Sequence, residues 1–356
     1  MKKGSLLVCL SLYSLMAFSQ NDVGQFLKGG KDDANILIKA YMQPYAYALG
    51  DGLNNGWYSS AKTHSLFGFD LTVGLTGIQV PDDAKTMDIN KLGLSRMNVN
   101  GSPSIAPTIA GKNDPGPTIT VYGNDNRDNK IVEFNSPQGT GMDIVPVPMI
   151  QVGFGLLPHT DLIVRFVPEM KYKNNGDEMK IGLWGFGAKH NFKEWIPVLK
   201  TLPFDASLFA SFSEVNGQSE LSFKPEDYSS NTAITIVPFN TDGQMLKMKT
   251  KTSKIGLVVS KQIAILTVFG AIGQSTSKTN IDLLGTYPVV VATTSPVGFE
   301  VSKSGAIKDP INTEFKTSNI SLEAGLRVKI TLLSLFASIN KSEYTSLNVG
   351  LSLGFR

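Results

Sequence analysis

The feature that most constrains this fold is an alternation of apolar and polar residues with a period of two. In the last segment, apolar side chains stand at every second position from Leu347 to Phe355, with Ser, Asn and Gly between them. Similar alternation recurs between positions 317 and 330, 67 and 76, and 204 and 213. It places successive side chains on opposite faces of a β-strand. Because these segments exceed the five or six residues of an average strand, they predict an all-β protein with long strands.

The polar face of these strands separates two kinds of β-protein. A soluble sandwich usually carries Lys and Glu on its outer face, whereas here the polar positions hold mostly Gly, Ser, Thr and Asn. Hydrophobic residues make up 42% of the chain and charged residues 18%, against about 25% charged in soluble domains. Small polar residues suit a barrel lumen, and the apolar face then points to lipid. We predict an antiparallel transmembrane β-barrel, with a soluble exported β-protein as the alternative.

Connections between the predicted strands alternate between short and long, as they do in bacterial barrels. Short turns are expected at 158–160, 260–262 and 331–334. The segments 81–117 and 278–315 are long and rich in Pro, Gly, Ser, Thr and Asn, and are expected to be external. If successive strands cross the membrane in alternate directions from a periplasmic N-terminus, the chain has 12 spanning strands. A further pair of strands within 278–315 or 118–135 raises the number to 14. The prediction is therefore a barrel of 12–14 strands over residues 65–356.

The first nineteen residues have the three parts of a secretory signal peptide. Two lysines precede an apolar run from Leu6 to Phe18, and small residues at positions 17 and 19 mark a cleavage site before Gln20. Cleavage removes the single cysteine, Cys9, and leaves 31 basic and 30 acidic residues. The mature chain then has no disulfide framework, and its charge argues against a nucleic-acid partner. The expected location is the outer membrane of a Gram-negative bacterium.

Residues 20–64 contain one segment that does not alternate. Apolar residues from Ala34 to Tyr45 recur at helical spacing, Asp32 or Asp33 is suited to cap the helix, and Pro44 predicts a kink or an end. Two placements remain open: a helix packed on the periplasmic rim, and a plug inside the lumen. The candidate plug residues are Tyr41, Tyr45, Asn54, Asn55 and Trp57.

Aromatic residues are expected to mark the edges of the membrane. Tyr and Trp prefer this interface because the ring is apolar and its hydroxyl or N–H group is polar. Trp57 and Tyr58 before the first strand, Trp195 in a periplasmic connection and Tyr344 at a strand start fit two girdles. A second short helix is predicted over 194–199.

Three stretches are distinctive: GLNNGWYSSAKTH from Gly52 to His64, GFDLTVG from Gly68 to Gly74, and GFGAKHNFKEWIPVLKTLPFDASLFASF from Gly185 to Phe212. They resemble an uncharacterised family of outer-membrane β-barrel proteins of Gram-negative bacteria. More distantly, the plan is similar to the long-chain fatty acid transporters, whose N-terminal segment plugs a 14-stranded barrel that passes hydrophobic compounds. This second resemblance implies transport of small hydrophobic compounds. Those transporters carry an Asn-Pro-Ala turn where this chain reads Asn54-Asn55-Gly56-Trp57.

No catalytic, cofactor-binding or metal-binding pattern is found, so no enzymatic activity is expected. Ser352 lies in a G-x-S-x-G match, but a nucleophile elbow needs a following helix and a later His, and the chain ends at Arg356. The acidic turn at Asp125 lacks the Gly and Glu of a calcium loop. The candidate lumen-facing residues are Asp70, Glu323, Arg327 and Lys329, expected to form ion pairs within the lumen.

These observations predict a channel or transporter for small hydrophobic compounds. The alternatives are a non-transporting surface scaffold or adhesin, suggested by the long external loops, and the soluble exported β-protein. The expected partners are outer-membrane lipid, the barrel-insertion machinery and a small hydrophobic ligand.

Overall fold

The structure is a computed structural model, and it describes residues 25–355 apart from 124–126, 128–129, 175–176, 222–233, 236–242 and 296–297. The predicted signal peptide and most of the turn around Asp125 lie outside the described residues.

Ten antiparallel strands close into a barrel, in the order β1-β18-β17-β16-β13-β12-β10-β9-β8-β7. They are β1 (Phe69–Gln79), β7 (Ile144–Leu157), β8 (Thr160–Asn174), β9 (Asp177–Asn191), β10 (Asp205–Glu220), β12 (Met245–Ile263), β13 (Leu266–Leu284), β16 (Ile311–Ile330), β17 (Leu333–Lys341) and β18 (Thr345–Phe355). The first and last strands pair along their whole lengths, from Phe69 opposite Phe355 to Gln79 opposite Thr345, which closes the ring. The barrel prediction is therefore confirmed.

The predicted count of 12–14 strands is wrong, because ten strands close the ring and the further β-segments form hairpins outside the wall. Both candidate pairs exist: β5 (Thr118–Tyr122) with β6 (Lys130–Asn135), and β14 (Thr286–Ser295) with β15 (Gly298–Lys308). Each belongs to a small separate sheet, and β15 also pairs with the short β11 (Ile234–Thr235). Alternation reports that one face of a strand is buried, but not whether the strand spans lipid.

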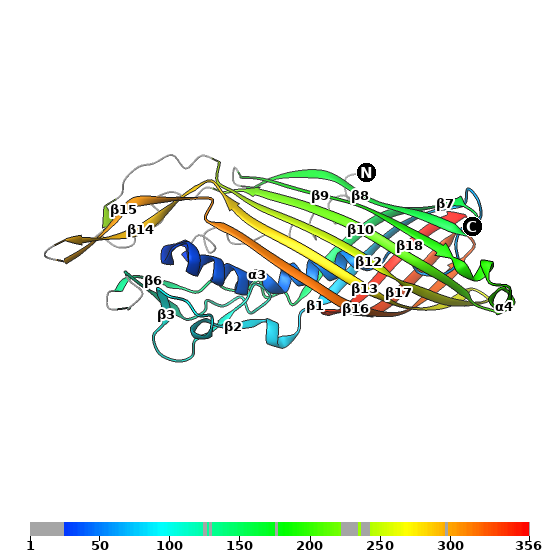
Figure 1. The fold of residues 1–356 in the computed structure, drawn as a ribbon, viewed down its shortest axis with the longest axis horizontal. Helices are drawn as coiled ribbons and strands as arrows, with labels where there is room; N and C mark the ends of the chain where they lie inside the picture. The colour runs from blue at the N-terminus through cyan, green and yellow to red at the C-terminus, as the bar shows by residue number, and fades with distance from the viewer. Residues whose placement is uncertain are drawn as a thin grey trace.

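The two ends of the barrel differ (Figure 1). At the end called here the short-turn end, tight turns at 158–159, 264–265 and 331–332 join neighbouring strands. The predicted helix over 194–199 corresponds there to η4 (Phe192–Trp195) and α4 (Pro197–Lys200). The opposite end, the long-loop end, carries residues 80–143 and the β14–β15 hairpin.

The wall is much taller on one side than on the other. Strands β12, β13 and β16 contain 19, 19 and 20 residues, whereas β17, β18 and β1 contain 9, 11 and 11. A tilted strand needs only about 9–11 residues to cross a bilayer. The tall strands therefore continue beyond the membrane at the long-loop end.

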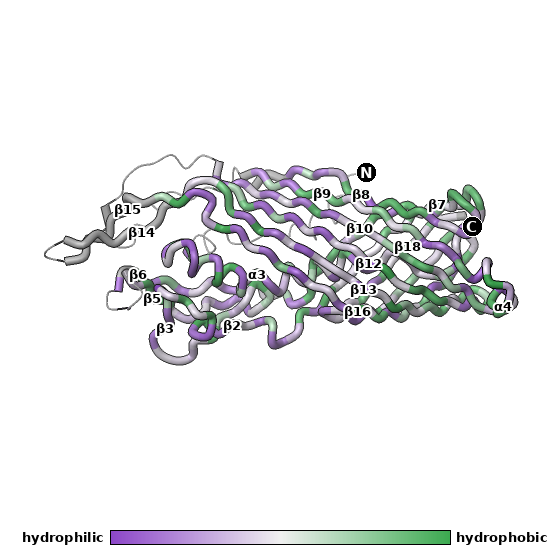
Figure 2. The backbone as a smooth tube through the Cα atoms, in the orientation of Figure 1, coloured by the Kyte–Doolittle hydropathy of each residue, from purple (hydrophilic) through white to green (hydrophobic). Residues whose placement is uncertain are grey.

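Hydrophobic residues are most frequent along the strands toward the short-turn end (Figure 2). On β18, Leu347, Leu351 and Leu353 are more than half exposed, while Ser346, Asn348 and Ser352 between them are buried. The same division holds on β1, where Leu71 and Val73 point outward and Thr72 inward. This continuous exposed apolar belt near the short-turn end requires lipid around it, since water would leave a large apolar area hydrated.

A belt substitution tests this assignment. Leu351→Lys is expected to lower the stability of the inserted barrel by about 2–4 kcal/mol, because it moves a charge into the hydrocarbon. Asn312→Lys on β16, beyond the belt on the outer face and opposite Asp282, is the matched control and should change stability by less than about 0.5 kcal/mol. Urea unfolding in lipid vesicles measures both. Equal effects of the two changes would contradict a lipid-facing belt.

Helix α3 (Lys31–Asn54) follows the short η1 (Leu27–Gly29). Of the two outcomes expected at Pro44, a kink or an end, the end is wrong, since the helix continues for ten residues beyond it. The surrounding protein holds it: Leu37, Ile38 and Leu49 are no more than 2% exposed. Asp33 does not cap the helix start; its carboxylate accepts hydrogen bonds from the backbone N–H groups of Ser95 and Arg96, both at 2.8 Å. No helix among the described residues is long and apolar enough to cross a membrane.

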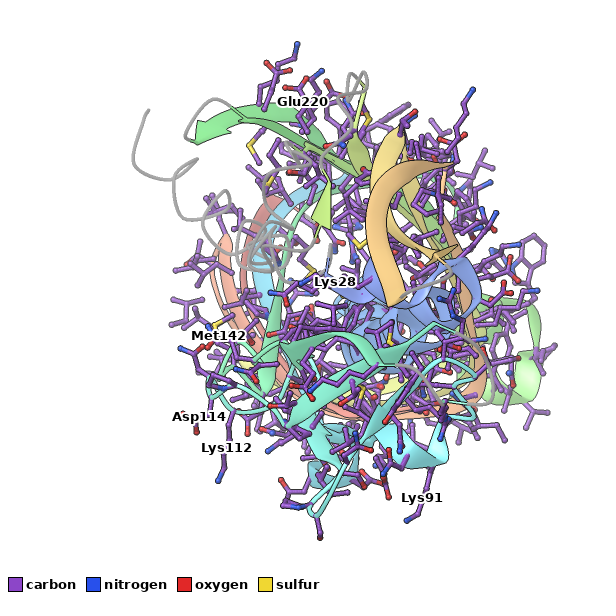
Figure 3. The ribbon with its side chains drawn as sticks, turned by 90° about the vertical axis from the view of Figure 1, so that its left-hand side faces the viewer. Lys28, Lys91, Lys112, Asp114, Met142 and Glu220 are labelled. Carbon is purple, nitrogen blue, oxygen red and sulfur yellow. The ribbon has the colours of Figure 1, made fainter. Side chains whose placement is uncertain are left out.

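The helix lies inside the ring of strands rather than on its rim, packed against β16, β13, β12, β1, β7 and β10. Viewed from the long-loop end, Lys28 lies near the centre of the ring, whereas Lys91 and Glu220 lie at the periphery (Figure 3). The chain then runs from Asn54 toward the short-turn end, where β1 begins. Residues 25–64 therefore pass through the barrel from the long-loop end to the short-turn end.

Residues 80–143 cover the helix on the side where the wall is low. They contain η2 (Asp82–Ala84), η3 (Ile89–Lys91) and two small sheets, one of β2 (Thr86–Asp88) with β4 (Ile105–Pro107), the other of β3 (Met97–Val99) with β5 and β6. Tyr41 donates a hydrogen bond to the Gln138 carbonyl at 2.7 Å, and Tyr45 donates to the Met142 carbonyl at 3.0 Å. The helix and this segment share one apolar core.

Candidate functional site

The candidate site is the contact between residues 53–64 and the inner wall of the barrel. The first wall residue of this contact is Arg165 on β8, whose side chain is 1% exposed. Its guanidinium donates to the carbonyls of Leu53 and Asn55, both at 3.0 Å, and to Gln151 Oε1 at 3.0 Å. The last carbonyls of a helix have no partner within the helix and carry partial negative charge. Arg165 therefore caps the C-terminal end of α3.

An aromatic ring completes this cap. The Arg165 guanidinium lies 4.0 Å from the ring centroid of Trp57, a distance typical of cation–π contact. Trp57 also donates through Nε1 to the Leu53 carbonyl at 3.1 Å. Gln151 on β7 donates to the Gly56 carbonyl at 3.1 Å. The backbone just after the helix is thus bound to two strands of the wall.

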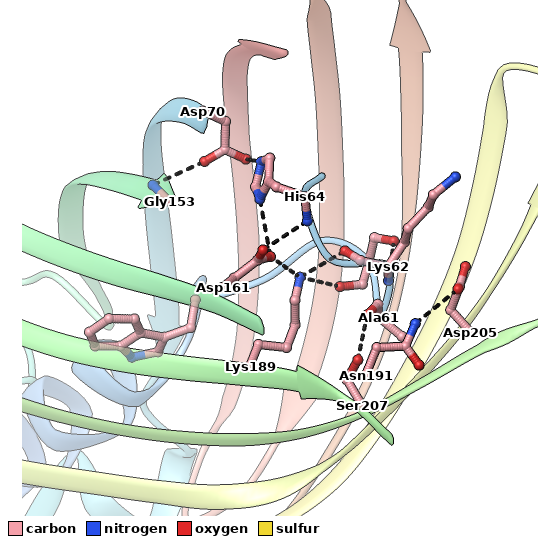
Figure 4. A network of polar contacts seen from close by, with 12 residues as sticks. Ala61, Lys62, His64, Asp70, Gly153, Asp161, Lys189, Asn191, Asp205 and Ser207 are labelled. Atoms are coloured by element: carbon pink, nitrogen blue, oxygen red, sulfur yellow. Dashed lines mark hydrogen bonds and ion pairs between the residues drawn. The ribbon is translucent and has the colours of Figure 1, made fainter. Parts of the chain in front are cut away.

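A second cluster binds the chain where it nears the short-turn end (Figure 4). The Asp161 carboxylate on β8 accepts from the His64 backbone N–H at 2.8 Å and lies 3.1 Å from His64 Nδ1. Lys189 Nζ on β9 is 3.2 Å from the same carboxylate and donates to the carbonyls of Ser60 and Lys62. Asp70 lies 3.3 Å from His64 Nε2. His64 therefore lies between two carboxylates of the wall.

A third contact occupies the opposite side of the lumen. Lys254 on β12 lies 3.3 Å from Glu323 on β16, and both side chains are 2% exposed. The Lys254 ammonium is 5.5 Å from the ring centroid of Tyr58, which packs edge-on against Phe209 at 4.9 Å. Ser60 Oγ and Ser260 Oγ of β12 are 3.3 Å apart. Residues 53–64 thus contact strands all around the ring.

The cavity in this part of the lumen is small. It has a volume of about 20 Å³ and is lined by Trp57, Tyr58, His64, Asp70 and Lys189, among others. That volume holds about one water molecule. This cavity therefore admits no solute larger than water.

The predicted lumen residues lie in different parts of the wall. Glu323 and Arg327 point inward, where Ser338 donates to Glu323 at 2.9 Å and Arg327 donates to Ser334 at 2.7 Å. Lys329 is half-buried near the short-turn end, and Asp70 contacts His64. The structure thus brings Asp70 together with residues 53–64, whereas Glu323 pairs with Lys254.

The predicted plug residues are all buried. Tyr41 and Tyr45 bond to the 80–143 segment, Asn54 donates to the Thr276 carbonyl at 3.1 Å, and Asn55 donates to Ser346 Oγ at 2.8 Å. The girdle assignment of Trp57, Tyr58 and Tyr344 is wrong, because these side chains are no more than 6% exposed. Trp195 is 68% exposed at the short-turn end.

Sequence reasoning missed Arg165, Asp161, Lys189 and Lys254. The sequence does indicate that these side chains face the lumen, because each is a charged residue at a polar position of an alternating strand. Among the described residues, no group of three or more His, Cys, Asp or Glu side chains is arranged to hold a metal ion. Ser352 is buried on β18, opposite Thr72 and Ser334.

The closed ring, its apolar belt and its polar interior define a transmembrane β-barrel of the outer-membrane class, with an internal N-terminal segment. The chain belongs to DUF6588, a family of unknown function whose model matches residues 1–355. This family membership agrees with the resemblance to uncharacterised outer-membrane barrels.

Solved structures of other barrels align only loosely. Ail, the attachment invasion locus protein of Yersinia pestis, is 8% identical over 82% of this chain and 100% of its own, with a TM-score of 0.26. The translocator domain of the autotransporter NalP from Neisseria meningitidis is 8% identical over 82% and 90%, with a TM-score of 0.30. The toluene transporter TodX from Pseudomonas putida is 8% identical over 85% and 77%, with a TM-score of 0.24. No curated protein matches the chain. The class assignment therefore rests on the geometry of the barrel.

Proposed function

We propose that this protein is a gated outer-membrane transporter for small hydrophobic compounds, with residues 20–64 as its plug. One observation carries the proposal: buried apolar side chains predominate on the inner wall toward the long-loop end, charged side chains gather toward the short-turn end, and one segment covers both. The part toward the long-loop end, here the apolar half, carries Val167, Ile181, Leu183, Val215, Met248, Ile281 and Phe315, with the buried Thr250, Thr279 and Thr313 among them. The polar half contains Arg165, Asp161, Lys189 and Glu323. Movement of helix α3 would expose an apolar surface suited to a hydrophobic solute.

The orientation follows from the two ends of the barrel. Barrels of this class place their short turns in the periplasm and their long loops outside. The plug therefore enters the lumen from the outer side, after export and removal of residues 1–19. Lipid surrounds the belt, and the barrel-insertion machinery delivers the chain to the membrane.

A reversible disulfide between the plug and the wall tests the transport proposal. Ser60 and Ser260 are both 2% exposed with their hydroxyl oxygens 3.3 Å apart, so cysteines there need only a small shift to reach the roughly 2.05 Å of an S–S bond. With Cys9 replaced by Ser, the Ser60→Cys/Ser260→Cys protein is expected to take up hydrophobic compounds into vesicles when reduced. Oxidation should lower uptake to the level of empty vesicles, because the plug is then fixed.

The two single-cysteine proteins are the matched controls, and oxidant should leave their uptake unchanged. Equal uptake by the oxidised and reduced double variant would reject a moving plug. Absence of uptake by the reduced double variant and by the unsubstituted chain would reject transport altogether.

The second candidate is a non-transporting surface-binding protein. It is favoured by a groove of about 610 Å³ in the 80–143 segment, lined by Lys85, Ile105, Lys112 and Asp114, among others. Ile105 is 46% exposed there. Loss of cell or glycan binding in Ile105→Asp, with uptake unchanged, would support this candidate. The soluble alternative conflicts with the exposed apolar belt.

A further inference from the structure

Three lysines form a row across the outer face of the tall side of the barrel. Lys251 on β12 is directly opposite Lys278 on β13, which is directly opposite Lys316 on β16. Their side chains are 47–65% exposed. Like charges directly opposite one another destabilise a sheet. Glu314 and Glu214 offset only part of this repulsion, because two carboxylates face three ammonium groups of the row.

The position of the row relative to the belt is the same on all three strands. Toward the short-turn end, the next outward row consists of the hydroxyl residues Ser253, Thr276 and Ser318. Two rows further on, Leu257, Ile272 and Leu322 form part of the apolar belt, and each is at least 42% exposed. The lysines therefore stand just beyond the hydrocarbon, at the depth of the lipid headgroups.

Aromatic residues next to the row mark the same depth. Trp184 on β9 is 38% exposed and stands opposite Glu214 of β10, which is opposite Lys251. Its ring packs against Phe212 with centroids 5.3 Å apart. Exposed Trp beside an apolar belt is typical of the membrane interface.

The surface is hollowed at this place. A depression of about 380 Å³ is lined by the three lysines, the three hydroxyl residues and Phe212, among others. Two glutamates stand beside it: Glu314 pairs with Lys278 and Lys316, and Glu214 is 2.9 Å from Lys249 and 3.7 Å from Lys251. Four lysines and two glutamates leave a net charge of +2. The depression thus offers ammonium and hydroxyl donors above an apolar surface.

We propose that Lys251, Lys278 and Lys316 bind the phosphate groups of an anionic lipid in the membrane leaflet at the long-loop end. The acyl chains lie on the belt below, Ser253 and Ser318 donate hydrogen bonds to the headgroup, and the phosphates relieve the repulsion within the lysine row. This site is on the outer wall and is independent of transport through the lumen.

The full chain in detergent, titrated with lipid A, tests the proposal. The readout is the temperature at which the compact form on an unheated detergent gel is lost. Lipid A, which carries two phosphates, is expected to raise that temperature, whereas the same lipid without phosphates and inorganic phosphate alone should not. Lys251→Gln/Lys278→Gln/Lys316→Gln should bind lipid A roughly 10- to 100-fold more weakly, because each lysine near a headgroup contributes to affinity.

The matched control is Lys91→Gln/Lys130→Gln/Lys308→Gln, which removes the same charge from exposed positions away from the row. It should keep full affinity. Glu314→Gln should bind several-fold more tightly, because it removes a competing carboxylate. If the triple variant does not fold, Lys251→Gln alone should still weaken binding severalfold. Equal stabilisation by the phosphate-free lipid or by inorganic phosphate would overturn the proposal, as would equal loss of affinity in the control.

Discussion

Replacing Arg165 with Met should release the C-terminal end of helix α3 and lower the free energy of unfolding by about 2–6 kcal/mol. The guanidinium donates to the carbonyls of Leu53 and Asn55 and to Gln151. Leu53 keeps its hydrogen bond from Trp57, so two acceptors lose this donor, at about 1–3 kcal/mol each. The methionine fills most of the volume but donates no hydrogen bond. Urea unfolding in lipid vesicles gives the overall change, and amide hydrogen exchange should increase from Leu53 to Trp57.

Lys171→Met is the control for this prediction, since Lys171 is an exposed basic residue on the same strand. It should change stability by less than about 0.5 kcal/mol. Arg165→Lys should be intermediate, because an ammonium keeps the charge but does not reproduce the planar fork that reaches both carbonyls. If Arg165→Met behaves like Lys171→Met, the cap does not hold the helix.

Replacing Asp161 with Ala is expected to lower the free energy of unfolding by about 3–5 kcal/mol. The change leaves the Lys189 ammonium, which is 3% exposed, without the carboxylate 3.2 Å away. It also removes the acceptor for the His64 backbone N–H. Breaking a buried pair on one side is costly because the remaining charge stays out of water.

A double-mutant cycle separates this effect from a simple loss of packing. Asp161→Ala/Lys189→Met should be less destabilised than the sum of the two single variants, with a coupling of about 0.5–3 kcal/mol, because the second change removes the stranded charge. The exposed Asp114→Ala is the control for loss of an acidic side chain. Additive effects of Asp161→Ala and Lys189→Met would mean that the pair does not act as a unit.

The wall of the barrel could be predicted from the sequence with good accuracy. Segments such as Leu347–Leu353 alternate strictly, and the structure divides them into an exposed apolar face and a buried polar face as expected. The strand count was not predictable in this way. The hairpins β5–β6 and β14–β15 pair outside the ring, and short β-forming segments of this kind do not reveal whether they span lipid.

The site shows a similar limit. Helical spacing identifies α3, but the end expected at Pro44 depends on local propensity, which tertiary packing overrides. Trp57 precedes the first strand, a position typical of a residue at the membrane–water interface. Only the fold shows that its ring stacks on Arg165, which lies 108 positions later in the chain.

Residue spacing along the chain is enough to show that the protein is β-rich, that one face of its strands is apolar and the other small and polar, and that one helix precedes the strands. These properties are local, because they depend on the spacing of side chains along one segment. The tertiary structure alone decided how many strands close the ring, and that residues 53–64 run through the lumen, held by Arg165, Asp161 and Lys189. These contacts join residues about 100 positions or more apart, and their geometry is fixed only when the barrel closes around the chain.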